Sequence, residues 1–105
     1  MQQLIYNVTV NIDHDIHTEW VNWMKTVHIP DVMASKCFVE SRFTQVQSNE
    51  EHGGVTYSIQ YLAASQADLD RYQREFAPKL QKEHTERYKG KFAAFRTLLK
   101  MVAQY

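Results

Sequence analysis

The chain has 105 residues, 44% of them hydrophobic and 23% charged, a composition that is typical of a globular domain and not of a disordered chain. Twelve basic residues balance twelve acidic ones, so the zero net charge argues against binding to nucleic acid or to anionic membranes. The N-terminus shows no signal-peptide pattern and no apolar run is long enough to span a bilayer, which predicts a cytoplasmic protein. We expect one domain, residues 1–105, without an internal disulfide because Cys37 is the only cysteine.

The first part of the chain predicts a strand, a helix and a second strand. Residues 4–12 alternate apolar with polar side chains, a period of two that is typical of a half-buried strand. An apolar stripe at helical spacing follows: Ile16, Trp20, Trp23, Met24 and Val27. Pro30 is expected to end this helix, because the residue before a proline is disfavoured in the α region, and to open a short helical turn through Met33. Residues 37–46 predict the second strand.

The rest of the chain predicts a hairpin, a second helix and a last strand. A turn-forming cluster at residues 48–54 leads into an alternating strand at residues 55–62. Ser65 with Asp68 predicts a helix N-cap, Pro78 a kink or break, and Gly90 a left-handed end. The helix stripe comprises Leu69, Tyr72, Phe76, Leu80, His84 and Tyr88. Residues 91–105 also fit a helix, but a fourth strand is the more consistent completion.

These elements predict an α+β, ferredoxin-like β-α-β-β-α-β fold, a four-stranded antiparallel sheet with two helices on one face. The helix-facing side of the central strands would hold Tyr6, Val8, Val10, Ile12, Val55, Tyr57, Ile59 and Tyr61. The opposite face would hold Asn7, Thr9, Asn11, Glu40, Arg42, Thr44, Thr56, Ser58 and Gln60. Few of these are charged, so a second copy packed sheet to sheet is expected to cover them in a homodimer. The alternative is a monomer with a mildly polar surface.

Four strings resemble an uncharacterised bacterial family that is known only as a domain of unknown function. They are residues 6–12 (YNVTVNI), 23–24 (WM), 28–33 (HIPDVM) and 95–99 (FRTLL). The resemblance covers nearly the whole chain and implies the dimeric α/β-barrel fold and the dimer, but no activity. Sister families with this barrel include small monooxygenases, isomerases and haem-degrading enzymes, although fold is weak evidence of chemistry.

Two histidines are candidates for proton transfer. His28 stands at the end of the first helix with Asp31 three residues later, and a carboxylate near an imidazole suits a general base. The plainer interpretation is that both residues only cap helix ends. His84 follows the helix stripe and either faces the sheet or is a partly exposed histidine without a partner. The resemblance to haem-binding relatives would cast His84 and Asn7 as haem partners, but alternation places Asn7 on the face away from the helices.

Five further side chains are candidates for ligand binding. Trp20 and Trp23 could line a pocket under the helix or be plain core, and Tyr57 lies on the same side of the sheet. Arg42 and Arg96 could together receive a carboxylate or phosphate if both reach the polar sheet face.

Other chemistry finds little support in the sequence. His14 and His17 near Asp13 or Asp15 form only a weak zinc signal, and Cys37 has no base beside it, so we expect no metal site and a structural cysteine. No nucleotide-binding glycine motif or P-loop occurs, and no cofactor is expected.

Two functions remain open. The first is a homodimeric module without catalysis that binds a small organic molecule or only assembles. The second is a small metal-free enzyme of the monooxygenase or isomerase kind, with His28 or His84 as proton carrier. A closed apolar cavity that reaches one of these histidines would favour the enzyme, whereas a filled core with every histidine in water would favour the module.

Overall fold

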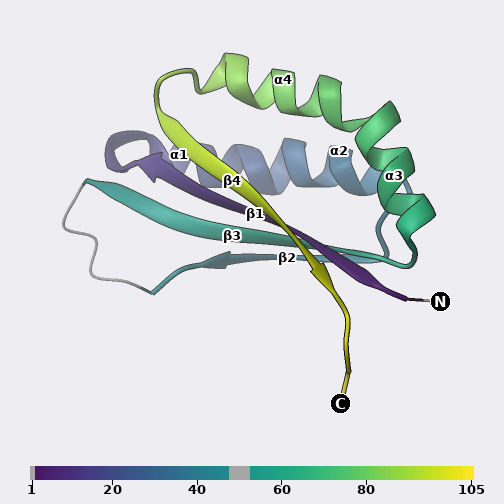
Figure 1. The fold of residues 1–105 in the computed structure, drawn as a ribbon. Helices are drawn as coiled ribbons and strands as arrows, with labels where there is room; N and C mark the ends of the chain where they lie inside the picture. The colour runs from purple at the N-terminus through teal and green to yellow at the C-terminus, as the bar shows by residue number, and fades with distance from the viewer. Residues whose placement is uncertain (1, 48–52) are drawn as a thin grey trace.

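Four antiparallel strands and a layer of helices on one sheet face make up the fold (Figure 1). The computed structural model describes residues 2–47 and 53–105, so most of the turn predicted at residues 48–54 lies outside the described residues. The strands are β1 (Leu4–Asp13), β2 (Glu40–Gln45), β3 (Gly54–Ala63) and β4 (Phe92–Lys100). The helices are η1 (His14–Ile16), α1 (His17–Trp23), η2 (Met24–His28), α2 (Ile29–Ala34), α3 (Gln66–Glu75) and α4 (Ala77–Arg87). The predicted α+β, ferredoxin-like fold is confirmed.

The sheet has the strand order β2-β3-β1-β4, which places β1 and β3 at its centre. Tyr6 lies opposite Tyr61 on β3, and Val8 lies opposite Arg96 on β4. The fourth strand is therefore confirmed, since β4 pairs with β1 along its whole length. Strand β2 is shorter than predicted, because Cys37 and Phe38 pack into the core before it begins.

The first helical segment continues through Pro30, so the prediction that this proline ends it is wrong. Ile29, the residue before Pro30, has φ −64° and ψ −43° and is α-helical. The turn that precedes it, η2, is a π-helix from Met24 to His28. The proline ring would collide with the carbonyl four residues earlier in a regular α-helix. A π turn holds one more residue, and this wider turn gives the ring room while the chain stays helical.

The second helical segment follows the sequence signals closely. Ser65 caps α3, where its Oγ accepts a hydrogen bond from the Asp68 N–H at 3.2 Å. Phe76, with φ −121°, separates α3 from α4, and Pro78 stands in the first turn of α4. Gly90 has φ +77°, the left-handed conformation that glycine adopts most readily. The predicted cap, break and left-handed residue are all confirmed.

The core lies between the helices and the sheet. The eight helix-facing residues predicted on β1 and β3 are all buried or packed against this core. Trp20 from α1, Leu69 from α3 and Tyr88 after α4 are fully buried over them. None of the described helices is both long and apolar enough to cross a membrane.

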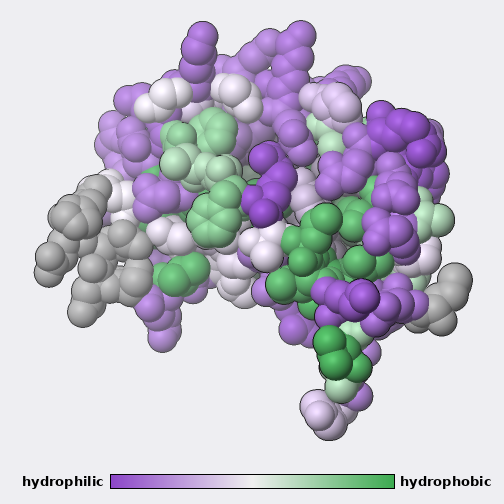
Figure 2. Space-filling model, viewed as in Figure 1, coloured by the Kyte–Doolittle hydropathy of each residue, from purple (hydrophilic) through white to green (hydrophobic). Residues whose placement is uncertain are grey.

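The opposite, open face of the sheet carries polar side chains that bond to one another. Ser58 Oγ donates to Asn7 Oδ1 at 2.6 Å, and Asn7 Nδ2 donates to Thr9 Oγ1 at 3.2 Å. Strand β4 adds apolar groups to this face, because Phe95 lies opposite Thr9 and Leu99 opposite Ile5. Figure 2 shows apolar side chains gathered over β4 and the C-terminal segment, where Phe95, Leu98, Leu99 and Val102 are exposed.

Candidate functional site

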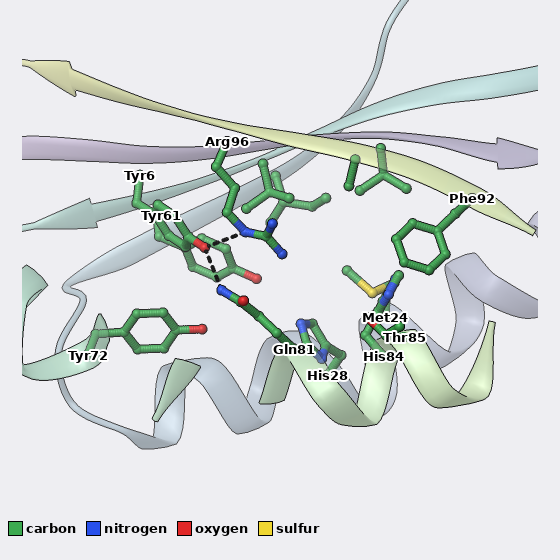
Figure 3. A pocket seen from close by; sticks show the side chains of 14 residues that line it. Tyr6, Met24, His28, Tyr61, Tyr72, Gln81, His84, Thr85, Phe92 and Arg96 are labelled. Carbon is green, nitrogen blue, oxygen red and sulfur yellow. Dashed lines mark hydrogen bonds between the residues drawn. The ribbon is translucent and has the colours of Figure 1, made fainter. Parts of the chain in front are cut away.

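A cavity lies between the helices and the sheet (Figure 3). The sheet contributes Tyr6, Val8, Val10, Ile59, Tyr61, Phe92, Ala94 and Arg96 to its wall, and the helices contribute Met24, His28, Tyr72, Gln81, His84 and Thr85. The volume that water centres can occupy in this cavity is about 40 Å³, which is room for about three waters. The site therefore suits a small ligand or one end of a larger ligand.

One end of the cavity is rich in hydrogen-bond donors. Arg96 Nε donates to the Tyr6 hydroxyl oxygen at 3.0 Å, and Gln81 Nε2 donates to the same oxygen at 3.4 Å (Figure 3). The hydroxyls of Tyr61 and Tyr72 also line this end. Burial is the largest effect that raises the pKa of Tyr61 and of Tyr72, so both hydroxyls stay protonated at neutral pH.

His84 is held in one neutral form by a tryptophan. The ring is 8% exposed, and its Nε2 accepts a hydrogen bond from Trp20 Nε1 at 2.9 Å. Because an indole N–H can only donate, Nε2 must be unprotonated and the neutral ring carries its proton on Nδ1. Burial, and then the positive charges of His28 and Arg96, lower the pKa of His84 to about 4. The interpretation of His84 as a partly exposed histidine without a partner is therefore wrong.

His28 carries an unpartnered polar atom in a ring that lines the cavity. Its Nδ1 is buried and has no hydrogen-bond partner among the described residues. Burial lowers the pKa of His28 to about 4, against an opposing effect of the Asp31 charge. The ring stacks on Trp23 with centroids 5.2 Å apart and lies 5.6 Å from the ring of His84. A neutral imidazole in this position can accept a proton or a hydrogen bond from a bound molecule.

The predicted pair of His28 with Asp31 does not form a hydrogen bond through Nδ1, and Asp31 is exposed in the first turn of α2. The predicted pair of Arg42 and Arg96 is also wrong. Arg42 lies on the open face near Glu40, with 3.8 Å between Nη2 and Oε1, whereas Arg96 points to the helix side. Alternation along β4 decides this, because Arg96 lies opposite the helix-facing Val8.

The aromatic candidates surround the cavity without lining it. Trp20 is a core residue, and Trp23 packs behind His28, with the Arg87 guanidinium 5.4 Å from its ring centroid. Tyr57 lies farther along the sheet, where its hydroxyl is 3.1 Å from His17 Nδ1. Of the predicted site residues, the structure brings His28, His84 and Arg96 together.

The structure also places the residues that the sequence suggested for zinc and haem. The rings of His14 and His17 are tilted by 53° with centroids 5.2 Å apart, but no group of three potential metal ligands occurs within residues 2–47 and 53–105. The haem arrangement suggested by relatives does not fit, because Asn7 lies on the open face and Nε2 of His84 is occupied by Trp20. Cys37 is buried, as expected of a structural cysteine.

Sequence reasoning missed the donors at the far end of the cavity: Tyr6, Tyr61, Tyr72 and Gln81. The alternation of β1 and β3 had already placed Tyr6 and Tyr61 toward the helices, but as core. Gln81 precedes His84 by three residues and so shares its side of α4. This helical spacing was the available signal.

Comparison with known proteins identifies the family. A family model described as a domain of unknown function (DUF4286) matches residues 3–102. The chain belongs to the DUF4286 family. The resemblance to a domain of unknown function is thus confirmed, and no curated protein sequence matches the chain.

Solved structures similar to this DUF4286 chain share its fold at low identity. A dimeric ferredoxin-like protein from an uncultured marine organism has a TM-score of 0.74 at 10% identity, over 98% of this chain and 97% of that chain. An EthD-like protein from Ralstonia eutropha has a TM-score of 0.70 at 11% identity, over 100% and 96%. SnoaB, a cofactor-independent oxygenase from Streptomyces nogalater, has a TM-score of 0.68 at 10% identity, over 96% and 95%. At such identity the likeness shows the fold alone.

Proposed function

We propose that this DUF4286 protein is a homodimer that binds a small organic molecule in the cavity between its helices and its sheet. The observation that carries the proposal is the buried Nδ1 of His28, which has no partner among the described residues and belongs to a ring that lines this cavity. An unsatisfied buried polar atom costs about 1–3 kcal/mol. A bound molecule that donates a hydrogen bond to Nδ1 would remove this cost.

Native mass spectrometry of the freshly purified protein tests this proposal. We expect twice the chain mass plus a discrete extra mass. His28→Phe, which removes the acceptor and fills space beside it, should lose the extra mass, whereas the exposed control His14→Gln should keep it. A bare protein, together with unchanged His28 NMR signals across a screen of small organic fragments, would contradict small-molecule binding.

The dimer part of the proposal rests on the open sheet face. Its amide and hydroxyl side chains are already paired, as in the hydrogen bond from Asn11 Nδ2 to Thr56 Oγ1 at 3.0 Å, so a second layer could cover them at little cost. Phe95, 64% exposed on the same face, would gain most from this cover. The similar ferredoxin-like protein from an uncultured marine organism is dimeric, which agrees with this proposal.

A metal-free enzyme is the second candidate. The two cavity histidines are neutral, and they differ: His84 carries its proton on Nδ1, while Nδ1 of His28 has no partner among the described residues and is an acceptor in the tautomer protonated on Nε2. Such a pair suits removal of a proton from the bound molecule by His28. The cofactor-independent oxygenase among the structural neighbours agrees with this chemistry, although it shares only the fold.

Hydrogen exchange in the bound molecule separates the two candidates. If His28 acts as a base, the molecule recovered from the protein should take up deuterium at an acidic C–H when the protein is incubated with it in D₂O. His28→Gln should abolish this uptake. Binding without any uptake would leave the non-catalytic module as the function.

A further inference from the structure

Resting on the proposed function, we propose that the bound molecule is a small monocarboxylic acid. Its carboxylate binds the Arg96 guanidinium at the tyrosine-lined end of the cavity, and the rest of the molecule extends past Met24 and Phe92 to His28, where a polar group hydrogen-bonds Nδ1. The step beyond small-molecule binding is the chemical class of the ligand.

Arg96 lacks an acidic partner. The ion pairs within residues 2–47 and 53–105 involve Arg42, Arg74, Lys82 and Arg87 as cations, and none involves Arg96. Only its Nε is engaged, in the hydrogen bond to Tyr6. The two terminal nitrogens of the guanidinium remain to form the parallel hydrogen bonds with which arginine receives a carboxylate.

The hydroxyls beside Arg96 add donors and no negative charge. The Tyr6 oxygen already accepts from Arg96 and from Gln81, so its own proton is left to donate elsewhere. The hydroxyls of Tyr61 and Tyr72 have no hydrogen-bond partner in the described part of the chain and line the same end. A cluster of donors around one cation is complementary to an anion.

The charge and the shape of the cavity favour a monocarboxylate. Among the described residues that line the cavity, Arg96 is the one cationic side chain, and both histidines there are neutral at pH 7. One cation balances the single charge of a carboxylate, but not the nearly double charge of a phosphate monoester. Figure 3 shows Met24, Thr85, His84 and Phe92 across the cavity from Arg96, where Met24 and Phe92 supply apolar surface for a short hydrocarbon segment.

A matched pair of probes tests the ligand class. Butyrate and butyramide have nearly the same shape and differ in charge. We would titrate each into ¹⁵N-labelled protein and derive the dissociation constant from the side-chain signals of His28. Butyrate should bind at least about tenfold more tightly than butyramide, because hydrogen bonds to a charged group are the stronger ones.

The variants assign this difference to Arg96. Arg96→Gln should reduce the affinity for butyrate to that for butyramide, while Arg42→Gln, on the other face of the sheet, should leave it unchanged. Arg96→Lys keeps the positive charge but loses the parallel N–H donors of the guanidinium, so it should retain part of the preference for butyrate over butyramide. If Arg96→Gln fails to fold, the comparison of the two probes on the unaltered protein still decides.

Results that contradict the ligand class can be told apart from results that contradict small-molecule binding. Equal binding of butyrate and butyramide would overturn the proposal that the ligand is a monocarboxylic acid. Inorganic phosphate binding as tightly as butyrate would also overturn it. Small-molecule binding would stand in both cases. If neither probe moved the His28 signals, both the ligand class and the cavity as a binding site would be overturned.

Discussion

At the residue scale, two neutral histidines form the chemistry of the cavity. The rings of His28 and His84 are 5.6 Å apart, and burial is the first cause of the low pKa of each. If one ring were protonated, its charge would oppose protonation of the other. At neutral pH His84 therefore has its N–H at Nδ1, and His28 can accept a proton or a hydrogen bond at Nδ1 in the tautomer that is protonated on Nε2.

The low pKa values predict how stability depends on pH. The pKa of each histidine is about 4 in the folded chain and 6.5 as the ordinary value, so between these values the unfolded chain binds more protons. The free energy of unfolding should keep the whole contribution of both histidines above pH 6.5. It should decrease as the pH falls toward 4, by at most about 3 kcal/mol per histidine.

Urea denaturation at several pH values in this window measures the effect. His28→Phe removes one titrating group, so its free energy of unfolding should decrease less over this window. In His14→Gln, at the surface, the decrease should be as large as in the unaltered protein. A free energy of unfolding that stays constant down to pH 4 would contradict the neutral buried histidines.

Trp20 is the positioning residue for His84. Trp20→Phe should destabilise the protein by about 1–3 kcal/mol, because the buried Nε2 of His84 loses its donor. It should also change the side-chain ¹⁵N shifts of His84, since the proton is no longer confined to Nδ1. Trp23→Phe is the control, because no hydrogen bond joins Trp23 to His84. Unchanged His84 shifts in Trp20→Phe would show that the indole does not select the tautomer.

At the element scale, the π turn before Pro30 places His28. This turn adds one residue to the helical segment, and each residue of an α-helix rotates the following side chains by about 100°. The turn therefore decides which later residues of the segment face the sheet. The sequence shows the proline, but whether a helix stops at it or widens to pass it depends on what packs around it.

The central strand pair has a close approach between Gly54 and the side-chain amide of Asn11. A Cβ at Gly54 would collide with the side-chain amide of Asn11, which lies over it. Gly54→Ala should therefore destabilise the fold by about 1–3 kcal/mol, the usual cost of overpacking. Chemical denaturation measures this change.

A double-mutant cycle isolates the cause. Asn11→Ala removes the obstacle, so Gly54→Ala should cost much less in an Asn11→Ala background, and the two free-energy changes should not add. Additive changes would mean that the glycine is needed for another reason, such as backbone conformation.

At the scale of the whole molecule, the open sheet face predicts the assembly. Phe95→Glu places a charge at the centre of the proposed interface and should shift sedimentation at micromolar concentration from two chains to one. Val27→Glu, an exposed position in η2, is the control and should keep the dimer. A single chain mass for the unaltered protein would contradict the homodimer.

Composition and periodicity by themselves determined the first three strands, the two helical segments and the sidedness of the sheet, whereas the fourth strand followed only from completing the β-α-β-β-α-β order. These are local properties: alternation with period two decides the face of each residue on a strand, as for Asn7 and Tyr6, and capping residues such as Ser65 decide where a helix begins. The family resemblance agreed with them.

Only the tertiary structure decided the site. Tyr6, Gln81 and Arg96 are far apart in the chain and meet because β4 pairs with β1 beneath α4. Trp20 reaches His84 across 64 residues, and no local pattern shows that their nitrogens face each other. Secondary structure follows from neighbours in sequence, whereas a cavity and its hydrogen bonds depend on how distant elements pack.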